Sequence, residues 1–398
     1  MTIQQGYKQT ELGIIPEDWE VKQIRDGLNL LTDFDANGSF ADMAENVQTY
    51  NGGGYAWYVR ATDLEQNTPL SDVKYVDEAS YKFLKKSSLH GGEVLIAKRG
   101  DIGKVYLFQA KTTFATLAPN LYLLKLNEQV HSTYLYYYLK SINGQKALKD
   151  INASTSLGAL YKEDVKNLYI LYPPIAEQRV IAKALSDVDG LIAALDKKIA
   201  KKRLLKQGAM CKLLSLSGRG KKWFNTKLGN VVNIRKGSML TSDKFVAGNI
   251  PVIAGGKIPA GYHNVANRPA NTITISASGA SAGYVALYNK PIFATDCSTI
   301  EPCSTYDIHY IYHLLKYYQS EIFAMQTGGA QPHVHPSDLN ELQILYAKDI
   351  EEQQAIATIL SDMDKEIADL EAQLDKYRLL KSGMMQKLLT GQIRLKTE

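Results

Sequence analysis

RLLKQGAMCKLLS occupies residues 203–215 of the chain, and RLLKSGMMQKLLT occupies residues 378–390, with nine of the thirteen positions identical. The match extends upstream without a gap, so that residues 175–215 align with residues 350–390 and share 22 identities in 41 positions. Similarity at one fixed spacing over this length indicates an internal duplication. The fold is therefore predicted from the repeated segment outward.

Each copy of the repeat is predicted to form one long helix. Apolar residues recur at alternating spacings of three and four, which is typical of a coiled-coil seam. No proline interrupts either seam, and Pro173 and Pro174 precede the first helix, where helices begin. A single helix would leave its apolar stripe exposed, so the other copy is its predicted partner. The predicted seam residues are Leu185, Val188, Ile192, Leu195 and Ile199 in the first copy and Leu360, Met363, Ile367, Leu370, Leu374 and Tyr377 in the second.

The charges favour an antiparallel pairing of the two helices. Residues 175–215 carry nine bases and four acids, whereas residues 350–390 carry five bases and eight acids. Within each copy the acids come early and the bases late, so antiparallel packing opposes unlike charges and lets the helix dipoles cancel. At about 1.5 Å per residue, such a helix is roughly 60 Å long. The basic face that includes Lys201 and Lys202 either pairs with the second helix, which we favour, or lies along a polyanionic partner.

The segments between the helices also resemble each other. GEVLIAKRGDIGKVYLF at residues 92–108 and NTITISASGASAGYVALY at residues 271–288 each predict a strand, a glycine-bearing turn and a second strand. The predicted fold class is α/β (α+β), with two globular domains joined by two long helices in an antiparallel coiled coil and related by an internal pseudo-two-fold axis. We expect the domains at opposite ends of the helical rod and the two chain ends close together. The predicted boundaries are residues 1–174, first globular domain; 175–215, first long helix; 216–349, second globular domain; and 350–398, second long helix with its tail.

The composition predicts a globular protein of the cytoplasm. Apolar residues make up 45% and charged residues 22% of the 398 residues, with a net charge of +5. Cys211, Cys297 and Cys303 lack the paired spacing of a zinc knuckle, so reduced thiols are expected. The N-terminal segment has no signal pattern, and no apolar run reaches membrane-spanning length. We therefore expect no membrane partner.

Several motifs together resemble the specificity subunits of type I restriction-modification enzymes, known as HsdS. They are GIIPEDWE near the start, PPIAEQRVIAKALSDVD and IEEQQAIATILSDMD at the helix starts, QPHVHPSDL before the second helix, and LLTGQIRL near the end. The resemblance covers essentially the whole chain. It implies two target-recognition domains that each read one half of a split sequence in double-stranded DNA. It also implies two methyltransferase (HsdM-like) subunits docked on the helices and restriction (HsdR-like) subunits in the cleaving complex. S-adenosylmethionine would then bind the methyltransferase partner, and no cofactor is expected on this chain.

The duplication leads to the same interpretation, because dimeric readers suit half-sites that lie one turn of DNA or more apart. The two domains differ in sequence, so the half-sites are expected to differ, and the helices are expected to set the spacer between them.

The residues predicted to contact DNA lie mainly in glycine-bearing turns and polar loops. Arg99 in KRGDIG is suited to guanine or to a phosphate, the alternative being a solvated hairpin. Arg60 is either a base reader or half of an ion pair with Asp63. The loops around residues 152–162 and 326–335 occupy matching positions, although most such loops only turn the chain. The full predicted set is Arg60, Lys98, Arg99, Ser154, Thr155, Lys162, Lys257, Tyr262, Ser278, Thr327, Gln331, His333 and His335.

Two other chemistries are disfavoured by the sequence. His333 and His335 with Cys297 and Cys303 lack the ligand spacing expected for zinc, so no metal site is predicted. The tyrosines of STYLYYYLKS and IHYIYHLLKYYQS could stack on bases, but their helical spacing favours a core position.

No catalytic residues are predicted. Glu20-Val21-Lys22 resembles the Glu-x-Lys of nucleases but lacks a companion aspartate, and YPPI at residues 172–175 lacks the leading amide or acid of adenine methyltransferases. No glycine-rich cofactor turn or phosphate loop is present. The alternatives are a self-contained DNA-modifying or cleaving enzyme and a coiled-coil adaptor that binds only proteins.

The helix starts carry a second predicted interface. Glu177, Gln178, Glu352 and Gln353 are either part of the methyltransferase docking surface or serve to complement the charge at the helix N-termini.

Overall fold

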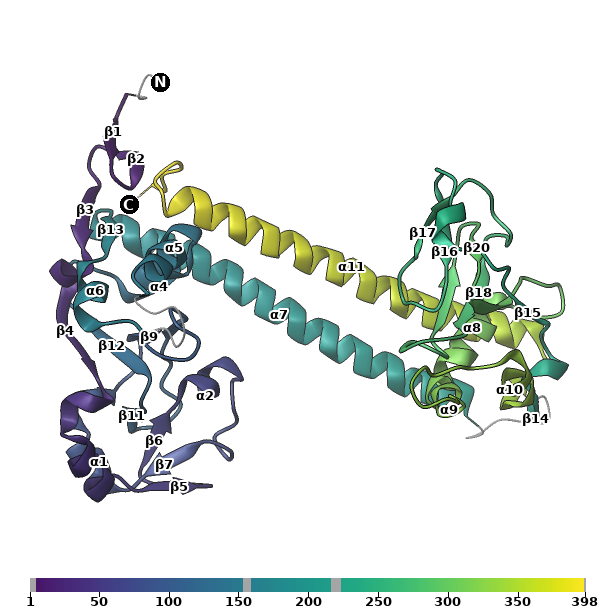
Figure 1. The fold of residues 1–398 in the computed structure, drawn as a ribbon, viewed down its shortest axis with the longest axis horizontal. Helices are drawn as coiled ribbons and strands as arrows, with labels where there is room; N and C mark the ends of the chain where they lie inside the picture. Colours follow the sequence, from purple (N-terminus) through teal and green to yellow (C-terminus); the bar gives the residue numbers. More distant parts are fainter. Residues whose placement is uncertain (1–4, 153–158, 216–222, 397–398) are drawn as a thin grey trace. The chain divides into compact units, whose positions relative to one another are not determined.

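The computed structural model describes residues 5–152, 159–215 and 223–396 (Figure 1). The contacts divide the chain into two compact units. Unit 1 comprises Met1–Ala194 and Leu374–Glu398, and unit 2 comprises Leu195–Gln373. The long helices α7 (Ile175–Leu214) and α11 (Ile350–Leu388) each contribute to both units. The prediction of two long helices is therefore confirmed, and each unit combines a globular part with a segment of both helices.

The globular part of unit 1 is built on short, mostly antiparallel sheets. A hairpin of β1 (Tyr7–Thr10) and β2 (Gly13–Pro16) precedes β3 (Glu20–Gln23), which pairs with β13 (Tyr169–Tyr172). The central sheet has the order β10 (Val105–Leu107), β9 (Val94–Ala97), β12 (Leu121–Leu126), β4 (Leu28–Asp33). A further sheet has the order β5 (Thr49–Asn51), β7 (Lys74–Val76), β6 (Ala56–Val59), β11 (Ala115–Leu117), β8 (Ser88–Leu89).

The helices of unit 1 include the predicted tyrosine-rich segment. They are α1 (Phe40–Asn46), α2 (Ala61–Glu65), α3 (Glu78–Phe83), α4 (Ser132–Lys140), α5 (Ile142–Asp150) and α6 (Lys162–Asn167). Tyr134, Tyr137 and Tyr138 of α4 are buried in the same core as Ile181 and Leu185 of α7 and Leu388 of α11. The tyrosines are core residues, as their helical spacing predicted.

Unit 2 repeats this plan with fewer strands. β14 (Trp223–Lys227) pairs with β22 (Gln343–Ala347), and the central sheet has the order β15 (Ile234–Lys236), β21 (Cys297–Ile300), β18 (Thr272–Ser276), β19 (Val285–Tyr288). The third sheet has the order β17 (Gly261–His263), β16 (Ile250–Ile253), β20 (Phe293–Ala294). The helices are α8 (Ile308–Tyr317), α9 (Gln319–Ala324) and α10 (Pro336–Glu341).

The two predicted glycine turns join equivalent hairpins. In unit 1, Ala97 N–H donates to Lys104 O and Gly103 N–H to Ala97 O. In unit 2, Ser276 N–H donates to Tyr284 O and Gly283 N–H to Ser276 O. Gly100 and Gly279 adopt φ values of +78° and +79°, a region that a side chain disfavours. Both turns are therefore closed by the same kind of hydrogen bonds, although the turn of unit 2 is one residue longer.

Within each unit the long helices pack antiparallel. In unit 1, Lys381 Nζ lies 2.6 Å from Asp189 Oδ1; in unit 2, Lys206 pairs with Asp364, and Lys202 Nζ lies 2.6 Å from Glu366 Oε1. Rising numbers in α7 thus meet falling numbers in α11. Asp364 and Lys381 are the duplicates of Asp189 and Lys206, so the two units form the same ion pair with the helices exchanged. This pairing explains part of the basic face of α7, as the charge pattern predicted.

The predicted seam residues lie between the two helices. Leu185, Val188, Ile199, Leu360, Ile367, Leu370 and Leu374 are buried, and Ile192, Leu195, Met363 and Tyr377 are partly buried. An apolar stripe of this kind stabilises a helix pair because each side chain leaves water on pairing.

The two chain ends meet in unit 1. The Tyr7 hydroxyl donates to Gly391 O at 3.0 Å, and the Arg394 guanidinium contacts both Asp18 and Glu177. The prediction that the ends lie together is confirmed. The hydrogen bond from Arg394 holds the pKa of the Asp18 carboxyl below its usual value.

None of the helices in the described part of the chain is both long enough and apolar enough to cross a membrane.

Candidate nucleic-acid interface

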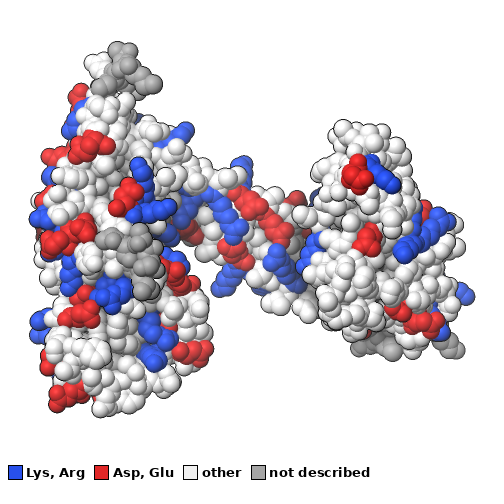
Figure 2. Space-filling view, in the orientation of Figure 1, with Lys and Arg blue, Asp and Glu red and all other residues white. Residues whose placement is uncertain are grey.

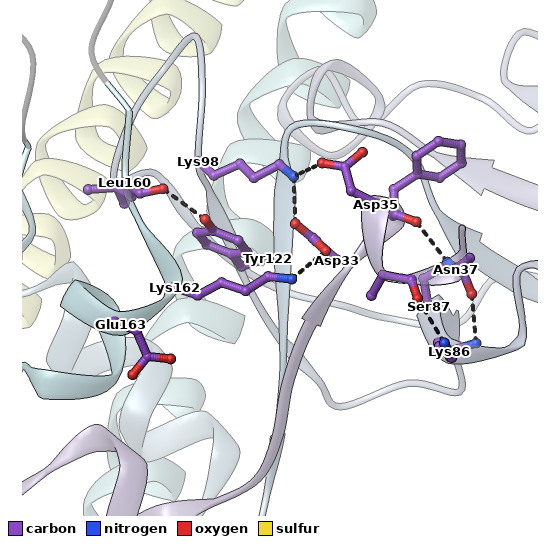
Figure 3. A network of polar contacts seen from close by, with 12 residues as sticks. Asp33, Asp35, Asn37, Lys86, Ser87, Lys98, Tyr122, Leu160, Lys162 and Glu163 are labelled. Carbon is purple, nitrogen blue, oxygen red and sulfur yellow. Dashed lines mark hydrogen bonds and ion pairs between the residues drawn. The ribbon is translucent and has the colours of Figure 1, made fainter. Parts of the chain in front are cut away.

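Four charged side chains meet beside the end of β4 in unit 1 (Figure 3). Lys98 Nζ lies 2.7 Å from Asp33 Oδ2 and 2.7 Å from Asp35 Oδ2, and Lys162 Nζ lies 2.7 Å from Asp33 Oδ1. The side chains of Lys98 and Asp33 are only 7% and 5% exposed. A buried charge is tolerated where a partner compensates its lost hydration, and here each buried charge has two partners.

The network joins segments that are distant in sequence. Burial raises the pKa of Asp33, but hydrogen bonds from Lys162 and Lys98 outweigh burial and leave this pKa below its usual value. Lys98 N–H donates to Asn120 O, Leu160 N–H donates to Lys98 O, and the Tyr122 hydroxyl donates to Leu160 O. The base of the turn that follows β9 is thereby fixed against β12 and the residues before α6.

The structure corrects the predicted role of Lys98. Its ammonium group is buried between two carboxylates, so it cannot reach a base or a phosphate without breaking both ion pairs. Lys162 is also paired with Asp33, although 35% of its side chain is exposed. Both lysines serve the packing of the turn in this structure.

Arg99, the next residue in the turn, differs from Lys98. Its side chain is exposed and has no ion-pair or hydrogen-bond partner among the described residues. A free guanidinium presents several donors in one plane and suits guanine or phosphate. The role of Arg99 as a DNA contact stays a prediction.

Arg60 has the alternative role that the sequence left open. Its guanidinium donates to both carboxylate oxygens of Asp63 at 3.0 and 2.6 Å, and the Asp63 side chain is 1% exposed. Withdrawing Arg60 would leave a buried carboxylate without its cation. Arg60 is therefore the ion-pair partner that holds the start of α2.

The charges of unit 1 are not gathered by sign. Figure 2 shows lysine and arginine interspersed with aspartate and glutamate on the visible face of this unit. An even mixture of signs gives little electrostatic steering, so this face alone does not indicate a polyanion partner.

In unit 2, four predicted contacts come together around the turn that follows β18. The Ser278 hydroxyl bonds to the Asp296 carboxylate, and Ser278 and Thr327 each form a backbone bridge with His333. The rings of His333 and His335 stack with centroids 6.2 Å apart. The cluster presents hydroxyl and imidazole groups where unit 1 presents charges.

The remaining predicted DNA contacts are dispersed. Tyr262 on β17 is 59% exposed, Gln331 is exposed, and the Lys257 ammonium lies 5.5 Å from the centroid of the Tyr284 ring. Ser154 and Thr155 lie outside the described residues. These roles stay predictions.

Sequence reasoning missed the acidic members of both clusters. Asp33, Asp35 and Asp296 lie at or just beyond strand ends, but nothing in their local spacing distinguishes them from ordinary turn residues. The position of Asp33 and Asp35 directly after an apolar strand was the available signal. Their lysine partners are too far away in the sequence for local spacing to reveal the pairing.

The predicted docking residues at the helix starts have internal roles. Gln178 accepts from His131 N–H and donates to Gln129 O and Pro173 O, and Gln353 accepts from Asp307 N–H and donates to Ala347 O and to the Tyr346 hydroxyl. Both side chains are buried, and each holds the residue that precedes the tyrosine-rich helix of its unit.

The glutamates before these glutamines also form equivalent contacts in the two units. Trp19 Nε1 donates to Glu177 at 2.9 Å, and Trp223 Nε1 donates to Glu352 at 2.9 Å. Glu177 is buried, and Glu352 is partly buried. The structure thus corrects the docking interpretation for Glu177, Gln178 and Gln353, whose side chains are turned inward, and gives Glu352 an internal contact as well.

The outer face of the helices carries repeated apolar residues instead. Leu379 and Leu380 in unit 1 are 74% and 49% exposed, and their duplicates Leu204 and Leu205 in unit 2 are 69% and 50% exposed. They belong to the two RLLK segments. Exposed leucines that recur at the same place in both copies are typical of a shared contact surface.

No group of three or more potential metal-ligating side chains occurs in the part of the chain that the structure describes. Cys297 is buried under β16, and burial raises its pKa to about 12, whereas Cys303 is exposed.

Comparison with known proteins places the chain in a family. A family model described as the type I restriction modification DNA specificity domain matches residues 16–202 and 220–376, one match for each half of the duplication. The chain belongs to this family of DNA specificity proteins.

Individual relatives match the whole chain or one half of it. The putative type I restriction enzyme MjaX specificity subunit of Methanocaldococcus jannaschii is 26% identical, over 99% of this chain and 98% of the relative. A putative type I specificity subunit of Mycoplasma pneumoniae is 31% identical over 42% of this chain and 46% of the relative. The crystal structure of the S subunit of a type I restriction-modification system from M. genitalium has a TM-score of 0.68 and 19% identity, covering 98% of both chains. The last similarity supports the fold.

Proposed function

We propose that the chain reads DNA sequence for a type I restriction-modification complex. Each unit contacts one half of a split, asymmetric site in double-stranded DNA, and the paired helices set the spacer between the halves. The observation that supports this most strongly is the duplicated frame with different turns. The hairpins after β9 and β18 share their backbone hydrogen bonds, yet one carries Arg99 and the other Ser278. Equivalent hairpins with different turn side chains suit a reader of two different half-sites.

The chain acts without catalytic residues of its own in this proposal. Two methyltransferase subunits bind S-adenosylmethionine and modify the DNA, and restriction subunits join for cleavage. Leu204 with Leu205 and Leu379 with Leu380 support two docking positions, because each pair is exposed and each is the duplicate of the other. A partner that binds one pair is suited to bind the second.

The test uses this chain together with its methyltransferase on a DNA library with randomised bases. The expected product is methylated DNA that contains one two-part, non-palindromic sequence with a fixed spacer. Inserting four residues, about one turn, into both α7 and α11 after the central seam residues should lengthen the preferred spacer and leave both half-sites unchanged.

Three outcomes would contradict the proposal. They are DNA methylation or cleavage by the chain alone, methylation without sequence preference, and an insertion variant that changes the half-sites. Absence of salt-dependent DNA binding, with or without the methyltransferase, would favour a protein-only adaptor.

A further inference from the structure

Asp35 is the exposed member of the unit 1 network. The buried Asp33 pairs with both Lys98 and Lys162, so Asp35 supplies the second negative charge of the network. Asp35 lies in the short helical turn Phe34–Asn37, and 65% of its side chain is exposed. Its carboxylate is therefore open to solvent on one side while it pairs with a buried lysine on the other.

The Asp35 carboxylate is nevertheless held in one orientation. Its Oδ2 accepts from the buried ammonium group of Lys98, which is itself fixed by Asp33 and lies 5.4 Å from the centroid of the Tyr122 ring. Asp35 Oδ1 has no hydrogen-bond partner within the described part of the chain. An exposed acceptor with a rigid, buried anchor is arranged for a ligand that donates a hydrogen bond (Figure 3).

Arg99 directly follows Lys98 in the turn, and the Lys98 ammonium contacts Asp35. The turn residue with an unpaired guanidinium is thus the chain neighbour of the lysine that holds the Asp35 carboxylate. Base pairs present both donors and acceptors in the major groove, so a reader can use side chains of both kinds.

We infer that Asp35 reads a cytosine in the half-site of unit 1 by accepting a hydrogen bond from its N4 amino group, with Lys98 as the positioning residue. The inference rests on the proposed function. A carboxylate near DNA is repelled by phosphates, so it lowers affinity unless it meets an amino group. Aspartate and glutamate accept from cytosine N4, whereas guanine or thymine would leave the carboxylate facing an acceptor or a methyl group.

The experiment measures base preference position by position, with the complex of this chain and its methyltransferase on a randomised DNA library. Asp35→Ala should lower the preference for cytosine at one position of one half-site by about tenfold to a hundredfold. Asp35→Asn should raise the use of adenine at that position, because an amide pairs with the adenine edge. Lys98→Met should weaken the preference at the same position, and Lys98→Arg should restore part of it. The other half-site should stay unchanged in every variant.

Asp72→Asn is the matched control, since Asp72 is an exposed aspartate of the same unit without a side-chain hydrogen bond in the described structure. This variant should leave the base preference unchanged at every position of the recognised DNA. Thermal unfolding of Asp35→Ala is measured alongside, and a preference lost at one position only, with the other half-site intact, separates reading from folding.

The inference is overturned if Asp35→Ala and Asp35→Asn keep every base preference. It is also overturned if the affected position prefers a base other than cytosine, or if all positions weaken together with a lower unfolding temperature. A complex with the unaltered chain that shows no split recognition sequence would overturn the proposed function itself. Normal recognition with no effect of Asp35 would overturn only the inference.

Discussion

Units 1 and 2 share the contacts that hold their long helices and differ in the contacts of their turns. The tryptophan–glutamate hydrogen bond, the buried glutamine before the tyrosine-rich helix and the lysine–aspartate pair all recur in both units. At the turns, unit 1 has a charged network around Lys98, whereas unit 2 has Ser278 bonded to Asp296 and bridged to His333. The comparison shows that the two units keep the same frame contacts while the side chains of their turns differ.

Removing the Arg394 ion pairs that join the two chain ends is expected to cause the largest loss of stability, and to cause it in unit 1. Arg394→Ala would leave Glu177, only 2% exposed, with Trp19 but without its cation. Breaking a buried pair costs about 3–5 kcal/mol, and we expect roughly 2–4 kcal/mol because the Arg394 side chain is partly exposed. Hydrogen exchange should show lower protection in unit 1 and unchanged protection in unit 2.

Lys396→Ala on the same tail is the control for this change, and it should leave the exchange pattern as it was. Equal loss of protection in both units after Arg394→Ala would show that the Arg394 ion pairs do not stabilise unit 1 alone.

A second difference between the units lies where α4 and α8 meet α7 and α11. The Tyr137 hydroxyl donates to Asp189 at 2.7 Å in unit 1, whereas in unit 2 His313 lies 3.0 Å from the hydroxyl oxygen of Ser361 and 3.9 Å from Asp364. Burial lowers the pKa of His313 to about 3, and the nearby charges of Lys206 and His309 add to this shift.

Because the folded state holds His313 neutral, the unfolded chain binds more protons between about pH 6.5 and pH 3, so the stability of unit 2 falls as the pH falls through this range. From the two pKa values we expect a loss of about 2 kcal/mol at pH 5 relative to pH 7.5. His313→Tyr, which installs the residue of unit 1, should remove most of this dependence. Denaturant unfolding at the two pH values measures it, and an unchanged pH dependence in His313→Tyr would refute the role of His313.

Much of the frame was predictable because its signals are periodic. The seam from Leu185 to Ile199 and its copy followed from residue spacing, and the antiparallel direction followed from charges that an ion pair such as Lys206 with Asp364 now accounts for. The internal contacts of Gln178 and Gln353 were not predictable, since a buried amide looks like a surface residue in sequence.

The contacts of the turn residues were also not predictable, because burial and exposure are decided by residues distant in the chain. Lys98 and Arg99 are adjacent and chemically alike, yet one is buried and the other exposed. What separates them is the position of Asp33 and Asp35, more than 60 residues away in the chain. Distant pairing of this kind leaves no local pattern.

The smallest expected effect concerns the two leucine pairs, and it tests whether the duplication extends to the partner. Leu379→Ala with Leu380→Ala in unit 1, and Leu204→Ala with Leu205→Ala in unit 2, should each weaken the binding of one methyltransferase subunit by about 1–2 kcal/mol and leave the other in place. Native mass spectrometry of the complex over a range of concentrations would show one bound copy where the unaltered chain holds two. Leu191, exposed in unit 1, has the acidic Glu366 as its duplicate in unit 2, so the unit 1 position offers more apolar surface. We therefore expect the copy at unit 1 to be the tighter one. Full binding of two copies by the variant altered at all four leucines would place the docking surface elsewhere.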